Sequence, residues 1–249
     1  GWSLGGGVLY RFIVDHPTQV ITALLVNPVS PFGFGGTKSI EGLPCFSDFA
    51  GSGGGVVNPT FIQFIKDGNR GAEDPNSPRN IINNFYYKPP FRSKREEDFL
   101  SGSLAEKTGE TAYPGDTFAT ANWPGVQPGV WGPINAGAPK YVLADVPALW
   151  AVEPKPAILW IRGSHDMICS DNSMFDIGAL GKLGYVPGWP GDEIYPPQPM
   201  VSQTRFVFEK YAQAGGQFQE KVISDTAHSP HIEKLEDFND LFHAFLKGH

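Results

Sequence analysis

The sequence predicts an α/β fold in which a mainly parallel sheet is flanked by helices. Two short apolar runs, at residues 20–26 and 157–161, are typical of strands buried on both faces. A helical pattern precedes the first run, because Leu4, Val8 and Phe12 recur on one helix face up to His16-Pro17. A strand that follows a helix in this way is part of a doubly wound parallel sheet.

The stretch from Ser30 to about Pro156 is too long for a plain crossover between neighbouring strands, so we expect an inserted cap. Residues 1–29 and 155–249 then form the core domain, and residues 30–154 form the cap. Capping residues predict three short helices in the cap. Asn58-Pro59 begins one over 60–67, Ser77-Pro78 begins a second, and Ser93 with Glu96 forms a capping box for a third over 94–105.

The C-terminal part alternates again between helix and strand. The run 157–161 ends at Arg162-Gly163, and a helix around residues 200–211 is closed by Gly215-Gly216. Residues 218–223 predict a last strand. An apolar stripe over residues 232–246 then predicts an amphipathic C-terminal helix.

Composition excludes several classes of function. The formal charge is −7 and no run of Lys or Arg occurs, which opposes binding to nucleic acid or to an anionic membrane. No apolar stretch approaches the roughly 20 residues of a membrane-spanning helix. The glycines at 51–55 lack the Lys-Ser/Thr of a phosphate loop, and His228-x-x-His231 is a weak zinc spacing. We therefore expect neither a cofactor nor a metal.

The chain begins with a candidate nucleophile. Gly1, Ser3 and Gly5 form G-x-S-x-G, the nucleophile elbow, in which a strand turns sharply into a helix with the serine at the apex. We expect both glycines to be required because a side chain at either position would collide with a neighbouring strand or helix.

A serine hydroxyl needs a base that is itself oriented by an acid. Asp166 follows the strand 157–161 and His228 follows the last strand, so both are expected at the same edge of the sheet. The order Ser3, Asp166, His228 is the nucleophile–acid–base order of one hydrolase class. Asp171 or Asp176 as the acid and His231 as the base remain alternatives.

Three segments in this order resemble one known family: GWSLGG at the elbow, ILWIRGSHD at the acid and AHSPHIEKLEDF at the histidine. The chain resembles the C-terminal part of an α/β-hydrolase of the esterase, proline-iminopeptidase and epoxide-hydrolase-like group. The resemblance covers residues 1–29 and 155–247. It implies a serine hydrolase that cleaves an ester, lactone or amide of a small apolar substrate through an acyl-enzyme.

The resemblance also assigns roles to residues. Ser3 would attack the acyl carbonyl, His228 would accept its proton, and Asp166 would hold the imidazole. The backbone N–H of Leu4 would be one oxyanion donor, while the second comes in this family from an earlier loop. Some relatives carry the acid one strand earlier, where this chain has Asn27, which cannot ionise.

Aromatic residues are the candidates for an apolar substrate wall: Trp2, Phe32, Phe34, Trp123 and Trp131. Two other activities remain open. An aminopeptidase would need Glu153 or the acidic cluster at 96–98 to face Ser3. A non-catalytic member of the fold would keep the pocket as a ligand-binding site.

An elbow needs a strand before it, and Gly1 is the first residue given. We therefore expect a second chain or a preceding segment, produced by proteolytic processing or absent from this sequence, to complete the sheet and the oxyanion hole. Cys45 and Cys169 either form a disulfide or remain free.

Overall fold

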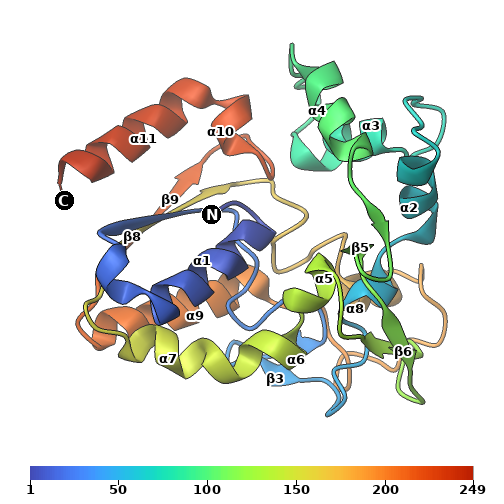
Figure 1. Ribbon diagram of the computed structural model, residues 1–249, viewed down its shortest axis with the longest axis horizontal. Helices are drawn as coiled ribbons and strands as arrows, with labels where there is room; N and C mark the ends of the chain where they lie inside the picture. The colour runs from blue at the N-terminus through green and yellow to red at the C-terminus, as the bar shows by residue number, and fades with distance from the viewer. Residues whose placement is uncertain (249) are drawn as a thin grey trace.

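The computed structural model describes residues 1–248. Its main sheet contains three parallel strands in the order β1-β8-β9, which are Thr22–Val26, Ala157–Gly163 and Phe218–Ile223 (Figure 1). Leu24 of β1 lies opposite Leu159 of β8, and Ile161 of β8 lies opposite Lys221 of β9. The expected α/β class with a parallel sheet is confirmed.

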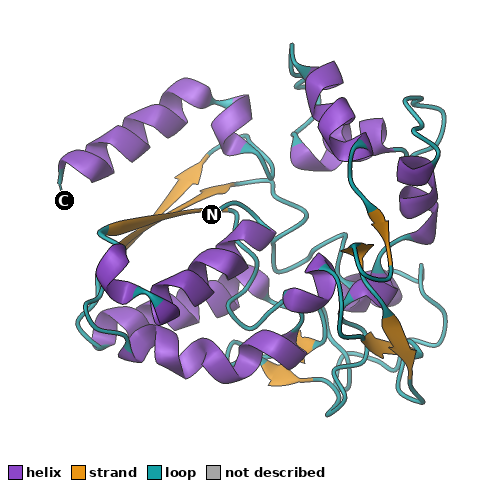
Figure 2. Ribbon diagram, viewed as in Figure 1, coloured by secondary structure: helices purple, strands orange, loops and turns teal. Residues whose placement is uncertain are grey.

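Three helices cover one face of the sheet: α1 (Leu4–Asp15), α7 (Val146–Ala151) and α9 (Met200–Gln213) (Figure 2). Leu25, Ile158 and Trp160 point towards these helices because alternate strand residues share a face. They form the largest core cluster together with Tyr10, Ile13, Leu149, Val207, Phe208 and Tyr211.

The opposite face is covered by α11 (Leu235–Lys247), which follows the short helix α10 (Pro230–Glu233). Phe238 and Phe245 of α11 pack on Val26, Leu159 and Ile161. Helices on both faces explain why these strands are apolar without alternation.

The connection from β1 to β8 contains the three predicted helices and several elements that were not predicted. The predicted helices are α2 (Pro59–Lys66), α3 (Pro78–Ile81) and α4 (Glu96–Leu104), and the side chains of Asn58 and Ser77 cap the first two. A π-helix over Ile82–Tyr86 extends α3. Besides α7 and two short 3-10 helices (Gly54–Val56 and Leu143–Asp145), the other elements are α5 (Pro133–Ala136), α6 (Pro139–Val142), β2 (Thr37–Lys38), β3 (Leu43–Pro44), β4 (Thr108–Gly109), β5 (Tyr113–Pro114), β6 (Thr117–Ala119) and β7 (Val126–Pro128).

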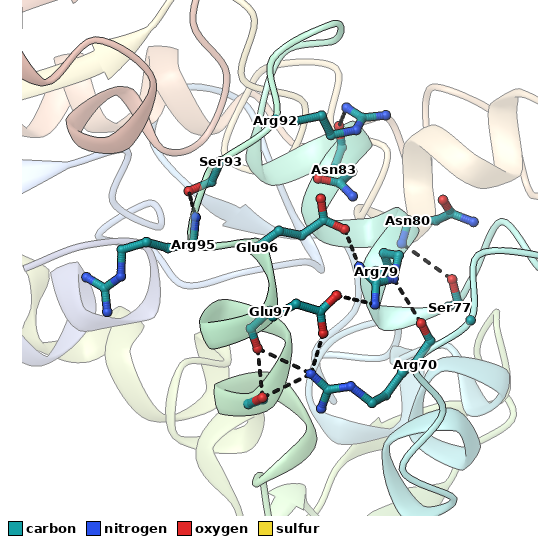
Figure 3. Close-up of polar contacts among 12 residues, drawn as sticks. Arg70, Ser77, Arg79, Asn80, Asn83, Arg92, Ser93, Arg95, Glu96 and Glu97 are labelled. Atoms are coloured by element: carbon teal, nitrogen blue, oxygen red, sulfur yellow. Dashed lines mark hydrogen bonds and ion pairs between the residues drawn. The ribbon is translucent and has the colours of Figure 1, made fainter.

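The capping box predicted for α4 does not form. Glu96 turns away from Ser93 and pairs with Arg79 of α3, since an ion pair within reach is a stronger partner than a backbone N–H. Glu97 pairs with Arg79 at 2.7 Å and with Arg70 at 2.6 Å (Figure 3). These arginines attach α4 to α3 and to the loop before it.

Helices α2–α4 lie beyond the carboxyl ends of β8 and β9, across from α10 (Figure 1). Both ends of the predicted cap pack elsewhere, because Phe32, Val146 and Leu149 belong to the main core. The cap boundaries at 30 and 154 remain a prediction. Both cysteines are free thiols, and within residues 1–248 no helix is long and apolar enough to cross a bilayer.

Asp176 is a buried carboxylate that begins α8 (Ile177–Lys182). Its Oδ2 accepts the N–H groups of Ala179 and Gln198, but its Oδ1 has no partner among residues 1–248. Burial raises its pKa to about 6, although these backbone N–H groups oppose the shift. The folded protein therefore disfavours ionisation of this group.

We predict that Asp176→Asn stabilises the protein at neutral pH. A raised pKa means that the stability present below pH 4 is lost as the pH rises through about 6. The variant should exceed the parent in free energy of unfolding by about 2 to 3 kcal/mol more at pH 7.5 than at pH 4. Urea unfolding at both pH values measures this difference. Asp192→Asn, at an exposed carboxylate, is the control, and an equal effect at both pH values contradicts the assignment.

Candidate functional site

Ser3 occupies a sharp turn between a strand-like segment and a helix. The N–H of Ser3 donates to the carbonyl of Val26, and the N–H of Val26 donates to that of Gly1, so residues 1–3 lie along β1. Helix α1 begins at the next residue, Leu4. Ser3 itself has φ 53° and ψ −124°, a backbone conformation that non-glycine residues rarely adopt. These features are those of a nucleophile elbow.

The two glycines of the motif differ in their surroundings. A Cβ on Gly1 would lie 2.4 Å from the carbonyl oxygen of Gly5, so a side chain is excluded there. A Cβ on Gly5 would meet nothing within 4 Å, and the expectation of a collision at this position is wrong. The close approach falls instead on Gly6, where a Cβ would lie 2.4 Å from Cβ of Pro28.

Asp166 and His228 are brought together from the ends of β8 and β9. Nδ1 of His228 lies 2.9 Å from Oδ2 of Asp166, and both side chains are almost fully buried. The other carboxylate oxygen accepts the N–H of Ile168 at 2.7 Å. The carboxylate is therefore fixed by its own loop on one side and holds the imidazole on the other.

The alternative acids and the alternative base have other partners. Asp171 accepts the N–H of Val201 at 2.8 Å at the start of α9, and Asp176 caps α8. The ring of His231 packs against those of Trp2 and Phe238. The position of Asp166 beside His228 favours this pair, and their catalytic role stays a proposal.

Asn27 joins the three loops of the site. It is buried, with φ 38°, at the end of β1. Its Oδ1 accepts the N–H of Gly163 at 3.0 Å, at the end of β8. Its Nδ2 donates to the carbonyls of Ala227 and His228 at 3.2 and 2.7 Å. Asn27, which stands where some relatives carry the acid, thus holds the acid loop and the histidine loop in place.

Cys169 lies beside Ser3, Asp166 and His228. Its thiol hydrogen-bonds with Ser3, and burial, reinforced by the charge of Asp166, raises its pKa. Among residues 1–248, Asp166, Cys169 and His228 are the group of potential metal ligands, with their ligand atoms within 4.8 Å of one another. Two members of this group, Asp166 and His228, are hydrogen-bonded to each other.

Aromatic rings surround His228. The ring of Trp2 lies 5.4 Å from the imidazole and that of Tyr86 5.7 Å, centroid to centroid. The indole N–H of Trp2 also donates to the carbonyl of His228 at 2.9 Å. Tyr86 ends the π-helix, an irregularity that is frequent at functional sites. The sequence carried no signal for Tyr86, because its position depends on how the helices of residues 59–104 fold back over the sheet.

The five residues predicted to form the substrate wall lie in different places. Trp2 contacts His228, and Phe34 packs in a cluster with Leu4 and Cys169. The remaining three have other surroundings: Phe32 is in the main core, Trp123 packs on Tyr195, and Trp131 is 60% exposed. Their contact with substrate stays a prediction.

No family model matches this sequence, and neither does any curated protein. Among solved structures, the chain is similar to a bacterial membrane phospholipase A described as a virulence factor, with 15% identity and a TM-score of 0.46 over 100% of this chain and 56% of that one. It is also similar to the carboxylesterase CesB of Bacillus subtilis, with 12% identity and a TM-score of 0.46 over 100% and 59%. The chain thus spans less than two thirds of either protein.

The fold of this chain agrees with the α/β class that its sequence predicts. It combines a parallel sheet between helices, a sharp turn at Ser3, and loops at the strand ends that carry Asp166 and His228. The geometry of these three residues, rather than the distant likenesses, supports the functional argument.

We predict that Asn27→Ala destabilises the protein by about 2 to 4 kcal/mol, because it removes three buried hydrogen bonds. Asn27→Asp should be pH-dependent instead. Its carboxylate would face two carbonyl oxygens, which raises its pKa, so stability is lost as the pH rises. Chemical unfolding at pH 4.5 and pH 8 measures both variants. Equal losses for Asn27→Asp at the two pH values would contradict the hydrogen-bond assignment.

Proposed function

We propose that this protein is a serine hydrolase that cleaves an ester, lactone or amide of a small, largely apolar substrate. The observation that carries the proposal is the buried Asp166–His228 pair at 2.9 Å, placed at the strand ends beside a serine in a strained turn. Such strain is costly, of order 1 to 3 kcal/mol, and is concentrated at functional sites.

The proposed reaction uses Ser3, His228 and Asp166 in two steps. The Ser3 oxygen attacks the acyl carbonyl while its proton moves to Nε2 of His228, and Asp166 stabilises the imidazolium through Nδ1. The same proton passes to the leaving alcohol or amine as its bond to the acyl carbon breaks. Water then attacks the acyl-enzyme while His228 accepts its proton. The proton returns to the Ser3 oxygen as the carboxylic acid product is released. The Ser3 hydroxyl must first leave Cys169 for His228, as apo catalytic hydrogen bonds are often incomplete.

The proposed oxyanion site begins at Leu4, the first residue of α1. Its N–H has no acceptor one turn earlier in the helix, and the positive end of the helix dipole lies there. We propose that a preceding segment or a second chain supplies the other donor. The outer edge of β1 is open beyond Gly1, and Val8 and Phe12 of α1 are 71% and 41% exposed. A strand added there would also cover these side chains.

An aminopeptidase-like activity has less support. Glu96 and Glu97 are neutralised by Arg79 and Arg70, and Glu153 pairs with Lys155 at 2.6 Å. These carboxylates already form ion pairs with cationic side chains of the protein, so they are not available to a substrate ammonium group. We therefore favour the hydrolysis of an ester.

We predict that Ser3→Ala lowers kcat/KM for a short acyl ester by about a thousandfold or more, because the nucleophile is removed. His228→Gln should have a similar effect, and Asp166→Asn should leave the fold intact but select the wrong imidazole tautomer. Release of 4-nitrophenol from 4-nitrophenyl butyrate measures each rate. Ser170→Ala, at a serine of the acid loop, is the control.

Unchanged turnover in Ser3→Ala would refute the proposed mechanism. A parent protein that binds the ester but releases a single equivalent of product or none would instead be a ligand-binding member of the fold. Steady-state turnover, measured over many equivalents, separates these results.

A further inference from the structure

A cavity of about 370 Å³ lies between helices α2–α4 and the loop that follows His228. Its volume is in the range of small-molecule sites. About half of the residues that line it are aromatic: Trp2, Phe61, Tyr86, Tyr87, Phe99 and Tyr113. Flat rings on several sides favour a planar group over a branched or extended one.

Two polar atoms of this wall have no hydrogen-bond partner within residues 1–248. They are Oγ of Ser229, a residue with 0% exposure, and Nδ1 of His231. Burial lowers the pKa of His231 to about 4, and the charge of His228 adds to this effect, so the ring is neutral at pH 7. Buried polar atoms without partners are costly, and both of these atoms belong to residues that line the cavity, so a bound group that reached them would relieve this cost.

Two rings of the cavity wall, those of Trp2 and Tyr86, also contact the ring of His228. The indole ring of Trp2 lies 5.4 Å from that of His228 and 5.3 Å from that of His231. Tyr86 contacts both Trp2 and His228 and also lines the cavity. A group bound in the cavity therefore packs on the same two rings as His228, the residue that would accept the Ser3 proton.

We propose that this aromatic cavity binds a hydroxyphenyl group of the substrate, an inference that rests on the proposed hydrolase function. The ring packs among the aromatic side chains. A phenolic hydroxyl both donates and accepts, so it pairs with the Ser229 hydroxyl and the neutral His231 ring in either tautomer. An unsubstituted phenyl ring would fill the same space and leave both polar atoms without partners.

Calorimetric titration with 4-ethylphenol and ethylbenzene tests the cavity without any catalysis. We expect 4-ethylphenol to bind more tightly, by about fivefold to tenfold. Ser229→Ala should abolish this preference and leave ethylbenzene affinity unchanged. The substitution removes a hydroxyl that has no partner, so it should not destabilise the fold. Ser170→Ala, outside the cavity, is the matched control.

A second variant blocks the cavity. Ser103 lies on its α4 wall and is partly exposed, so Ser103→Trp should fill the space and abolish binding of both ligands without changing the core. Binding of neither ligand to the parent, or equal binding of both, would overturn the proposal. So would a preference that survives Ser229→Ala.

A fluorophosphonate with a 4-hydroxyphenylethyl group then separates the two proposals. We expect it to label Ser3 at least about tenfold faster than its cyclohexylethyl analogue. Selective binding of 4-ethylphenol without any labelling of Ser3 would refute the hydrolase and leave the cavity assignment intact. Labelling of Ser3 at equal rates by both probes would support the hydrolase and refute the hydroxyphenyl site.

Discussion

The hydrogen bonds of the Asn27 side chain hold the site together. The segments that follow β1, β8 and β9 leave three different strands, and few backbone hydrogen bonds join them beyond the strand ends, such as the one from the N–H of His165 to the carbonyl of Thr226 at 2.8 Å. One buried amide accepts from Gly163 on the acid side and donates to Ala227 and His228 on the other. An amide suits this position because it has both a donor and an acceptor, whereas a carboxylate would repel the two carbonyl groups.

The acid loop and the histidine loop also approach each other closely through their backbones. A Cβ on Gly163 would lie 1.9 Å from the carbonyl of Ala227, so the acid loop and the histidine loop touch through backbone atoms. Glu233 accepts the N–H groups of Ala227 at 2.7 Å and Lys88 at 2.6 Å, which connects the histidine loop to the segment after the π-helix. The aromatic cavity lies at this junction, so its shape depends on the same contacts that fix His228.

The sequence predicted the strands of the sheet and the helices α1, α9 and α11 on its faces because these elements have strong apolar patterns, but it did not predict α7. It also predicted the meeting of Asp166 and His228, since residues that follow parallel strands reach the same edge of a sheet. It failed where contacts are long-range. Glu96 pairs with Arg79, a residue of another helix, and does not form the predicted capping box.

Apart from Trp2, the aromatic residues of the cavity could not be predicted from the sequence for the same reason. Phe61, Tyr86 and Phe99 come from separate short helices whose packing no local pattern specifies. In the sequence, Asn27 was considered only because it stands where some relatives carry the acid. Its role as a hydrogen-bonding link can be seen only once the positions of β8 and β9 are known. Cys169 gave no signal either, although its thiol lies against Ser3.

The central claim is that Ser3 is the nucleophile. The neighbouring thiol of Cys169 is the alternative nucleophile that a test must distinguish from it. Acid quench of the protein during turnover of a slowly deacylated ester, followed by peptide mapping by mass spectrometry, locates the acyl group directly. The account predicts one acyl group on the N-terminal peptide at Ser3. An acyl group on Cys169, or none on any residue while product accumulates, would contradict it.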